Sequence, residues 1–485
     1  MKLKEILNCI EVMESTASGE LEIGAIAYDS RRVKPGDLFV AVRGFEADGH
    51  RFIPMAAEKG CAAVLCEEPP AVDVPYVIVR DSRLALALCA GNYYRHPTEE
   101  MTVIGVTGTN GKTTVSVLIK QMLEKGLGAK VGLIGSISNM IGDEEFHTEH
   151  TTPESLDLQA LFRQMVDAGC THCVMEVSSH SLVLSRVAGV KFKVGIFTNL
   201  TQDHLDFHKT MEEYARAKSL LFPMCELSAA NADDPWMETV LKDAPGKVYT
   251  YSAESDKADL TARDIRLTAD RVKFCALEGS ELVRTTLHLP GKFSVYNALS
   301  VLSCARLLGI PLRDAADALS TAHGAKGRVE SVPTDGNYSV YIDYAVTPDA
   351  IENVLKTLRP IAPGRLVMLF GCGGDRDRKK RPIMGRIASE LSDYVIITSD
   401  NPRTEKPEDI IAEILPGLEG RPTPYTVIPD RIEAIRWAIE NHREGDLILL
   451  CGKGHEDYQV IGHEKIHMDE REIVADILRE RKERK

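Results

Sequence analysis

Residues 102–114 (TVIGVTGTNGKTT) hold the most specific chemical pattern in the chain. A β-branched apolar run leads into a glycine loop, and apolar residues at helical spacing follow it. A strand, a glycine loop and a helix in this order typically bind phosphate, because backbone N–H groups and the helix N-terminus face the anion. In such a loop Lys112 reaches the β- and γ-phosphates of a nucleotide, and the Thr113 hydroxyl binds Mg²⁺.

The match to the usual phosphate-loop pattern has one gap. Val106 stands where a glycine is expected five residues before Gly111. The alternative is a glycine turn that merely follows a buried strand. The intact Gly-Lys-Thr-Thr run and the patterns on both sides of it favour phosphate binding.

Two further apolar runs, residues 173–177 and 194–198, have the pattern of buried strands and end in polar residues. Glu176 closes the first run, and His204 follows the second. Ligands of open α/β sheets bind beyond the carboxyl ends of the strands, so we expect these residues to share a site with the phosphate loop. Glu176 and His204 are therefore candidate metal ligands, although each alone is as readily a solvated acid or a surface histidine.

The C-terminal third repeats this arrangement, with a polar motif after each of three strand-like runs. Gly371, Gly373 and Gly374, followed by Asp400 after the next strand, resemble a dinucleotide-binding fingerprint. Arg376 occupies the third glycine position, however, within a densely charged segment. Such a loop suits a carboxylate or phosphate ligand better than a nicotinamide, which argues against a dehydrogenase.

Strands and helices alternate along the chain, which predicts an α/β protein. We expect three domains: a small α/β domain over residues 1–97, a central domain over 98–327 and a Rossmann-like α/β domain over 328–485. The central domain is expected to be of the phosphate-loop type, with a mostly parallel sheet and helices on both faces. A length of 485 residues fits about three domains.

Bulk composition limits the class of partners. The net charge of −14 argues against general binding of nucleic acid or anionic membranes. No apolar run is long enough to insert into a membrane, and we expect no secretory signal, so the 11 cysteines fit a reduced, cytoplasmic protein. Cys170 and Cys173 form a lone C-x-x-C pair, which packing explains better than metal or redox chemistry.

Four motifs, taken together, resemble those of the Mur ligases in order and spacing. They are residues 108–113 (GTNGKT), 176–180 (EVSSH), 199–208 (NLTQDHLDFH) and 452–456 (GKGHE). The resemblance covers nearly the whole chain, and a loop without a glycine at Val106 is the form that this family normally shows.

The resemblance implies an activity in peptidoglycan precursor synthesis. The expected enzyme is an ADP-forming amide ligase that uses ATP and Mg²⁺. Its expected substrates are UDP-N-acetylmuramoyl-L-alanyl-D-glutamate and meso-diaminopimelate, and its expected intermediate is an acyl phosphate. The N-terminal domain would hold the UDP moiety, the central domain ATP, and the C-terminal domain the amino acid. We expect a monomer.

The resemblance also implies roles for individual residues. Nucleotide contacts fall on Gly108, Thr109, Asn110, Gly111, Lys112, Thr113, Thr114, Asn297, Arg328 and Asp343. Mg²⁺ ligands fall on Thr113, Glu176, His204 and Lys218, the last as a carbamate. Lys112, Glu176, His204 and Lys218 are the implied catalytic residues. By its local pattern alone, Lys218 is a surface lysine of an amphipathic helix over 214–222. An ammonium cannot bind Mg²⁺, whereas a carbamate offers an anionic oxygen.

Contacts to the UDP substrate fall on Ser30, Thr151, Thr152, Ser178 and Arg186, although local grounds favour Ser30 as a turn cap. Contacts to the amino acid fall on Arg376, Asp400, Asn401, Arg403, Gly452 and Glu456. Diaminopimelate has a second carboxylate where lysine has only hydrogen. A guanidinium at Arg403 can bind that carboxylate in a bidentate manner, and Glu456 can accept the distal ammonium.

Two positions depart from the family pattern. Val346 replaces a histidine, and because valine cannot hydrogen-bond we expect altered ATP affinity. Leu184 replaces a glutamine found in some relatives. The alternatives are a lysine-adding ligase, a folylpolyglutamate synthetase, a paralogue with drifted activity and a non-catalytic ATP-binding scaffold. Arg403 disfavours the first, and the intact Lys112, Glu176 and Lys218 disfavour the last.

Overall fold

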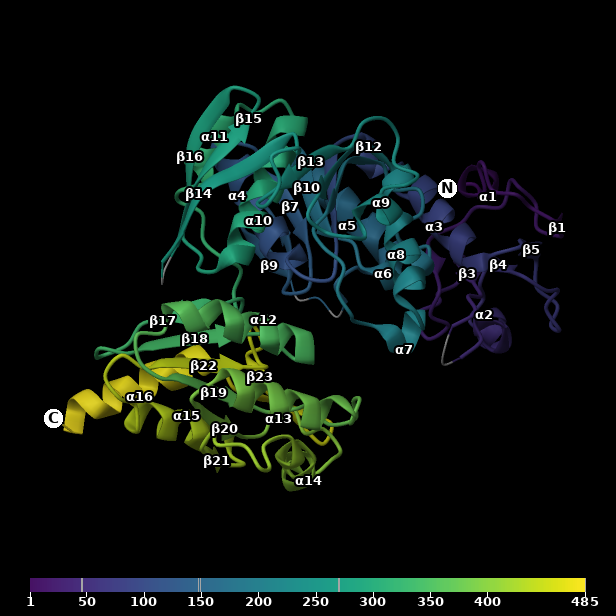
Figure 1. The fold of residues 1–485 in the computed structure, drawn as a ribbon. Helices are drawn as coiled ribbons and strands as arrows, with labels where there is room; N and C mark the ends of the chain where they lie inside the picture. The colour runs from purple at the N-terminus through teal and green to yellow at the C-terminus, as the bar shows by residue number, and fades with distance from the viewer. Residues whose placement is uncertain (45–46, 147, 149, 269–270, 485) are drawn as a thin grey trace. The chain divides into compact units, whose positions relative to one another are not determined.

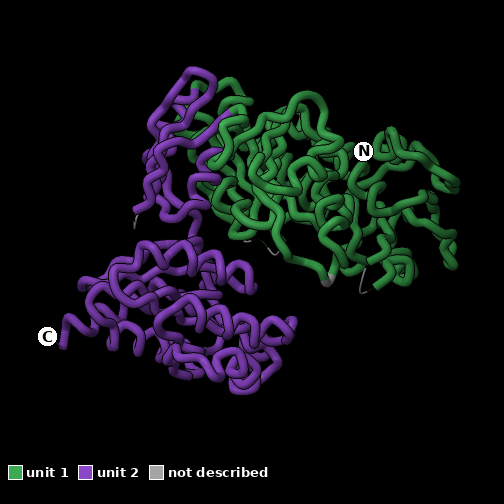
Figure 2. The backbone as a smooth tube through the Cα atoms, in the orientation of Figure 1, with its two compact units in different colours: residues 1–259, 300–311 green, residues 260–299, 312–485 purple. Residues whose placement is uncertain are grey.

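The protein was analysed as a computed structural model, which describes residues 1–484 apart from 45–46, 147, 149 and 269–270. The chain forms two compact units (Figure 2). The first comprises residues 1–259 and 300–311, and the second residues 260–299 and 312–485.

The first unit begins with a small sheet whose strand order is β1-β5-β4-β3-β2. Its strands are β1 (Glu14–Ser15), β2 (Ile26–Ala27), β3 (Leu38–Val40), β4 (Ala63–Cys66) and β5 (Tyr76–Ile78), and its helices are α1 (Leu3–Ile6), α2 (Ile53–Glu58) and α3 (Ser82–Tyr93). All neighbours pair in parallel except β1 and β5. Asp81 caps α3 by accepting a hydrogen bond from the Leu84 N–H.

A larger sheet fills the rest of the first unit, in the order β13-β12-β11-β6-β10-β7-β8-β9 (Figure 1). Its strands are β6 (Thr102–Thr107), β7 (Val131–Ile134), β8 (Asn139–Ile141), β9 (Glu144–Phe146), β10 (His172–Glu176), β11 (Phe192–Phe197), β12 (Cys225–Asn231) and β13 (Tyr249–Ser252). The six strands from β13 to β7 run in parallel, so their carboxyl ends meet at one edge. This edge carries β6, β10 and β11, as the three polar motifs predict.

Helices cover this sheet because its central strands are apolar on both faces. They are α4 (Lys112–Leu127), α5 (Ser155–Asp167), α6 (Ser179–Val183), α7 (Leu205–His208), α8 (Met211–Ser219) and α9 (Met237–Val240). Phe162 of α5 and Tyr214 of α8 pack in one core cluster with Val103 and Met175. Helix α4 packs against β6, β7 and β10. Cys170 and Cys173 are buried in the same cluster as Phe162, so the C-x-x-C pair serves packing as predicted.

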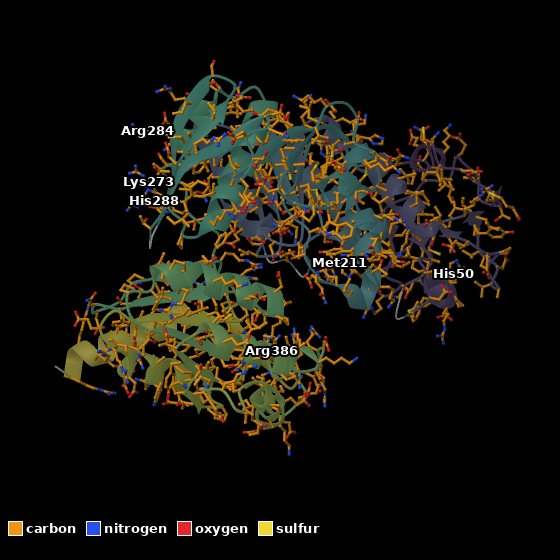
Figure 3. The ribbon with its side chains drawn as sticks, viewed as in Figure 1. His50, Met211, Lys273, Arg284, His288 and Arg386 are labelled. Atoms are coloured by element: carbon orange, nitrogen blue, oxygen red, sulfur yellow. The ribbon has the colours of Figure 1, made fainter. Side chains whose placement is uncertain are left out.

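The second unit begins with three antiparallel strands that sequence analysis did not predict. They are β14 (Leu260–Leu267), β15 (Val272–Glu278) and β16 (Glu281–Leu287), and α11 (Leu312–Leu319) follows. Helix α10 (Lys292–Leu307) belongs to this unit up to Leu299 and to the first unit from Ser300. Buried Val272 and Phe274 alternate with exposed Lys273 in β15, the pattern of a sheet with one solvated face. Figure 3 shows Lys273 and Arg284 at this part of the unit.

The rest of the second unit is a six-stranded sheet in the order β17-β18-β22-β19-β20-β21. Its strands are β17 (Glu330–Val332), β18 (Ser339–Asp343), β19 (Leu366–Phe370), β20 (Tyr394–Ile397), β21 (Tyr425–Val427) and β22 (Leu447–Cys451), with a hairpin of β23 (Tyr458–Ile461) and β24 (Glu464–His467). Its helices are α12 (Pro348–Leu358), α13 (Lys380–Leu391), α14 (Pro407–Ile414), α15 (Arg431–Glu440) and α16 (Glu470–Arg484). Two core clusters, one on each face, join the sheet to these helices.

The structure therefore confirms the predicted α/β class, with mostly parallel sheets between helices. Among the residues described, no helix combines the length and apolarity that crossing a membrane requires. The predicted domain boundaries at 97 and 327 stay a prediction.

Candidate active site

The loop between β6 and α4 is built by close packing against the end of β11. A Cβ atom on Gly108 would lie 1.9 Å from the Thr198 hydroxyl, so only glycine fits there. That hydroxyl donates to the Asn110 carbonyl at 2.7 Å, and the Thr109 N–H donates to the Asn199 carbonyl at 2.8 Å. The neighbouring strand thus fixes the loop in place at the start of α4.

Two lysine side chains converge on one carbonyl of this loop. Lys112 Nζ donates to the carbonyl oxygens of Gly108 and Thr109 at 2.9 and 2.8 Å. Lys218 Nζ donates to the same Gly108 oxygen at 2.8 Å. Burial, with the nearby charge of Lys112, lowers the pKa of Lys218 well below its ordinary value, so its amine is neutral far more readily than a surface lysine.

The local pattern of its helix was wrong about Lys218. The residue is only 1% exposed, because its side chain turns inward from α8 and passes over the Tyr214 ring, 4.5 Å from the ring centre. Burial here depends on how α8 packs against the loop, which no helical periodicity reveals.

Glu176 lies at the carboxyl end of β10 and accepts three hydrogen bonds. Thr113 Oγ1 donates to its Oε2 at 3.0 Å, the Ser136 N–H to its Oε1 at 2.8 Å, and the Ser136 hydroxyl to its Oε2 at 3.1 Å. Ser136 was not predicted from the sequence, although its place two residues after the end of β7, another parallel strand, was a usable signal.

The oxygens of Thr113 and Glu176 fit a magnesium ion. Adjacent ligands of an octahedral Mg²⁺ lie about 2.9 Å apart, close to the 3.0 Å observed between these two atoms. No three His, Cys, Asp or Glu side chains cluster as a metal site within the described residues. Mg²⁺ bound at phosphates commonly takes its further oxygens from the substrate and from water.

His204 opens helix α7 in a left-handed conformation, with φ of 53°. Its Nε2 lies 3.3 Å from Asp203 Oδ2, and its ring lies edge-on to His180 at 4.9 Å between centres. The next ring is Tyr214, 6.2 Å away, whose hydroxyl accepts a hydrogen bond from Thr109 of the phosphate loop. His204 is thereby connected to the loop through Tyr214.

Four of the five residues expected to contact the UDP substrate surround Glu176. The Thr151 hydroxyl lies 2.9 Å from that of Ser136. The Thr152 hydroxyl donates to the Glu176 carbonyl at 2.9 Å and accepts from the Ser178 N–H at 3.2 Å. Arg186 donates to the Thr152 carbonyl at 3.1 Å.

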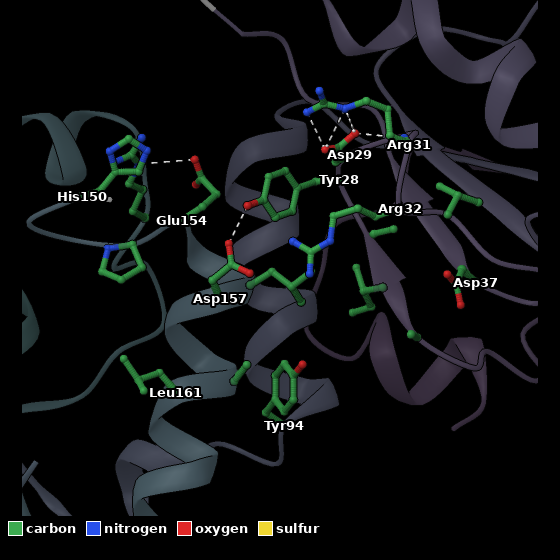
Figure 4. A pocket seen from close by; sticks show the side chains of 18 of the residues that line it. Tyr28, Asp29, Arg31, Arg32, Asp37, Tyr94, His150, Glu154, Asp157 and Leu161 are labelled. Carbon is green, nitrogen blue, oxygen red and sulfur yellow. Dashed lines mark hydrogen bonds and ion pairs between the residues drawn. The ribbon is translucent and has the colours of Figure 1, made fainter. Parts of the chain in front are cut away.

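Arg186 also lines a cavity of about 990 Å³ that extends to the N-terminal sheet (Figure 4). Tyr28 projects into this cavity and donates to Asp157 at 2.5 Å, and burial raises the pKa of its phenol. Arg31 pairs with Asp29 at 2.8 Å, which favours the turn-forming role of this segment. Ser30, the fifth expected residue, is itself buried between two lining residues.

Two loops of the second unit carry the residues expected to bind the amino acid. Asn401 of the first loop contacts the second: its side-chain Nδ2 donates to Glu456 Oε2 at 2.8 Å, and its side-chain Oδ1 accepts from Lys453 Nζ at 2.8 Å. Lys453 is fully buried and also lies 2.5 Å from Glu456 Oε2. Sequence analysis did not single out Lys453, which is the cation that holds this carboxylate.

Asp400 and Gly452 approach each other across the same two loops. Asp400 is 7% exposed, and its Oδ2 accepts no hydrogen bond from the described residues. A Cβ on Gly452 would lie 2.6 Å from that oxygen, so a larger residue would close the gap.

Arg403 adopts a left-handed conformation, with φ of 51°. Its guanidinium donates to the Gly374 and Asn401 carbonyls at 2.9 and 3.5 Å. Within the described chain it forms no ion pair with an acidic side chain, although it is half-buried. Arg376 is exposed and donates to the Asp375 carbonyl at 2.9 Å.

The three remaining nucleotide-contact candidates lie in the second unit. The Asp343 carboxylate accepts from the Val329 and Ala345 N–H groups, each at 2.8 Å, and burial raises its pKa. Arg328 lies over the Tyr344 ring at 5.0 Å. Asn297 is buried on α10.

Comparison with known proteins identifies the family. Three models match in order: the Mur ligase family catalytic domain over residues 22–94, the Mur ligase middle domain over 106–305 and the Mur ligase glutamate ligase domain over 327–454. A UDP-N-acetylmuramoyl-L-alanyl-D-glutamate–2,6-diaminopimelate ligase of Caldanaerobacter subterraneus subsp. tengcongensis is 47% identical over 99% of each chain. The chain belongs to the Mur ligase family. A ligase of the same name from Clostridium botulinum is 47% identical, covering 99% of this chain and 100% of its own.

Solved Mur ligases share the fold. A structure of a ligase bearing that name aligns with a TM-score of 0.73 and 32% identity over 99% of both chains. A MurF ligase from Thermotoga maritima in complex with ADP aligns with a TM-score of 0.64 over 96% of this chain and 99% of its own. At 18% identity, the second likeness shows the fold alone.

Proposed function

We propose that this Mur ligase joins meso-diaminopimelate to the D-glutamate carboxyl group of UDP-N-acetylmuramoyl-L-alanyl-D-glutamate, at the expense of ATP. Relatives with this name are 47% identical over essentially the full chain, which supports the reaction. The same reaction would place the enzyme in peptidoglycan precursor synthesis, in the cytoplasm, where both nucleotide substrates are found.

The preference for meso-diaminopimelate over lysine is inferred from the surroundings of the Arg403 side chain. Its guanidinium is half-buried and held by backbone carbonyls, with no acidic side chain of the described chain paired to it. A half-buried cation without an acidic partner favours an anionic ligand. The distal carboxylate of diaminopimelate supplies that charge, and lysine does not.

Phosphoryl transfer would occur at the phosphate loop. The acceptor carboxylate attacks the γ-phosphorus of ATP, a P–O bond forms, and the bond to ADP breaks. Both reactants are anions, so Lys112 and the loop N–H groups must offset their repulsion. Thr113 and Glu176 would hold Mg²⁺, with His204 as a further candidate, and the ion would neutralise charge on the phosphate oxygens.

Lys218 is proposed to act as a carbamate. Its depressed pKa supplies the neutral amine that attacks CO₂, forming an N–C bond and releasing one proton. The product carries a negative charge in place of a second ammonium beside Lys112.

The amine of diaminopimelate would then attack the acyl phosphate. A C–N bond forms, the C–O bond to phosphate breaks, and the amine loses a proton. Asn401 and Glu456, already joined by a 2.8 Å hydrogen bond, would orient the amino acid together with Arg403. Glu456 would accept the distal ammonium, with Asp400, Gly452 and Arg376 completing the pocket.

We retain the three-domain division at residues 97 and 327, which the three successive family matches support. In this arrangement the 990 Å³ cavity takes the UDP portion of the acceptor, and Arg186 leads from it to Glu176. A monomer is the expected state.

Phosphate release tests the proposal directly. The purified protein is incubated with ATP, Mg²⁺ and the UDP-muramyl dipeptide in three parallel reactions. One contains meso-diaminopimelate, one L-lysine and one no amine. We expect phosphate release with diaminopimelate alone. Release with lysine would refute the role of Arg403, and no release with either amine would refute the ligase.

A further inference from the structure

Helices α15 and α16 begin with oppositely charged residues that are completely buried. The side chains of Arg431 and Glu470 are both 0% exposed, and Arg431 Nη2 lies 2.8 Å from Glu470 Oε1. Arg431 Nε donates to the same oxygen at 2.9 Å. The pair is therefore a close, fully desolvated contact between the two helix starts.

The rest of the Arg431 guanidinium bonds to the main chain at two places. Its Nη1 donates to the Ser399 carbonyl at 3.1 Å, and its Nη2 donates to the Cys451 carbonyl at 2.9 Å. The residues that follow these carbonyls are Asp400 and Gly452. Each begins one of the two loops assigned to the amino acid.

The sheet does not connect these two loops directly. They leave β20 and β22, and β19 lies between those strands. Strands two places apart are separated by about 9.6 Å and share no ladder hydrogen bonds. The planar guanidinium of Arg431 bridges that gap at the carboxyl edge of the sheet.

Stability alone does not account for this arrangement. A buried ion pair contributes little net stability, because desolvating both charges offsets their attraction. A positive charge in the first turn of α15 is also unfavourable with respect to the helix dipole. Two main-chain carbonyls from separate loops are, in contrast, what a guanidinium can hold and a hydrophobic pair cannot.

We propose that Arg431, kept in place by Glu470, is a positioning residue that sets the spacing of the two amino-acid-binding loops. This inference rests on the proposed function. The spacing matters because Asn401 of one loop bonds to Lys453 and Glu456 of the other, at 2.8 Å in both cases. A shift of one loop relative to the other would break these two hydrogen bonds and misplace Glu456 relative to Arg403.

Two variants and a matched control test the inference. Arg431→Lys keeps the charge beside Glu470 but can reach only one carbonyl. Arg431→Met with Glu470→Met removes both charges and so leaves no unpaired buried ion. The control is Arg436→Met, because Arg436 joins the same two helices through Glu480 at 2.7 Å and, within the described part of the chain, forms no bond to either loop.

The measurement is steady-state KM for each substrate, together with the melting temperature. We expect both Arg431 variants to raise the KM for meso-diaminopimelate about tenfold or more, while KM for ATP and for the UDP substrate stays within about twofold. The control variant Arg436→Met should leave every KM unchanged, and its only effect should be a lower melting temperature. Because KM does not depend on the active fraction, partial unfolding of a variant leaves the test valid.

Two outcomes would overturn the inference. An unchanged KM for meso-diaminopimelate in both variants would refute it while leaving the proposed function intact. A wild-type enzyme that releases no phosphate with meso-diaminopimelate would refute the proposed function first, and this inference with it.

Discussion

Thr113 Oγ1 and Glu176 Oε2 lie 3.0 Å apart, joined by a hydrogen bond between the start of α4 and the end of β10. This contact brings together two motifs that are 63 residues apart in sequence. Both atoms are oxygens of the kind that Mg²⁺ prefers, at a separation that suits neighbouring ligands of one ion.

Glu176→Gln keeps the size of the side chain and removes its charge. We expect kcat to fall about a hundredfold, and the Mg²⁺ concentration for half-maximal activity to rise, because an amide is a weaker ligand than a carboxylate. Phosphate release titrated with Mg²⁺ measures both effects. Glu212→Gln, at an exposed position of α8, is the control. Unaltered Mg²⁺ dependence in the Glu176 variant would remove it from the metal site.

Lys218→Ala and Lys218→Arg should both abolish turnover, and high bicarbonate should restore neither. Alanine cannot form a carbamate, and the guanidinium of arginine stays protonated. Lys242→Ala, at an exposed lysine, should behave as wild type. Carbon NMR of the wild-type protein in labelled bicarbonate should show one carbamate signal that both Lys218 variants lack. Full activity in either variant would refute the carbamate.

Arg403→Lys tests the amino-acid preference. An ammonium replaces the planar guanidinium, so the bidentate pair of hydrogen bonds to the distal carboxylate is lost. We expect kcat/KM for meso-diaminopimelate to fall roughly tenfold to a hundredfold, equivalent to about 1.4–2.7 kcal/mol. Activity with L-lysine should remain low and change little. Equal losses for both amines would show that Arg403 does not read the distal carboxylate.

Glu405→Gln should reduce stability in a pH-dependent manner. The buried Arg381 donates to Glu405 at 2.8 and 3.0 Å and, as the largest cause, lowers the pKa of Glu405 to about 2. A depressed carboxyl pKa stabilises the fold above the ordinary value of 4.5, and this stabilisation is lost as the pH falls towards 2. The difference in melting temperature between wild type and variant should therefore be full at pH 6 and shrink below about pH 4.5.

The matched control for that experiment is Glu408→Gln, an exposed glutamate of α14. It should change melting temperature little at any pH. A Glu405 variant whose deficit stays constant from pH 6 to pH 3 would show that the ion pair with Arg381 does not govern the acid response.

Sequence alone was sufficient where a site is local or follows a strand. The phosphate loop needs only Gly108, Lys112 and Thr113 in one short run between a strand and a helix. Glu176 could be placed beside them because parallel strands end at a common edge. The same rule placed Asp400 and Gly452 at one edge of the second sheet.

Residues whose role depends on packing between distant elements could not be found this way. Lys218 has the pattern of a surface helix, and only the contact of α8 with the loop buries it. Lys453 and Arg431 are charged residues within ordinary helical or loop patterns, yet both are fully buried. The antiparallel strands β14–β16 were missed because strands were sought as continuous apolar runs, whereas buried residues alternate with more exposed ones in β15 and β16.

The lysine of the phosphate loop has consequences for turnover. Lys112 Nζ donates to the Gly108 and Thr109 carbonyls of its own loop. Nucleotide binding is therefore an exchange of partners: the ammonium gives up two carbonyl oxygens as it gains phosphate oxygens. Its net gain is smaller than the new contacts alone suggest. When ADP departs, the same two carbonyls are within hydrogen-bond reach of the ammonium, which favours product release.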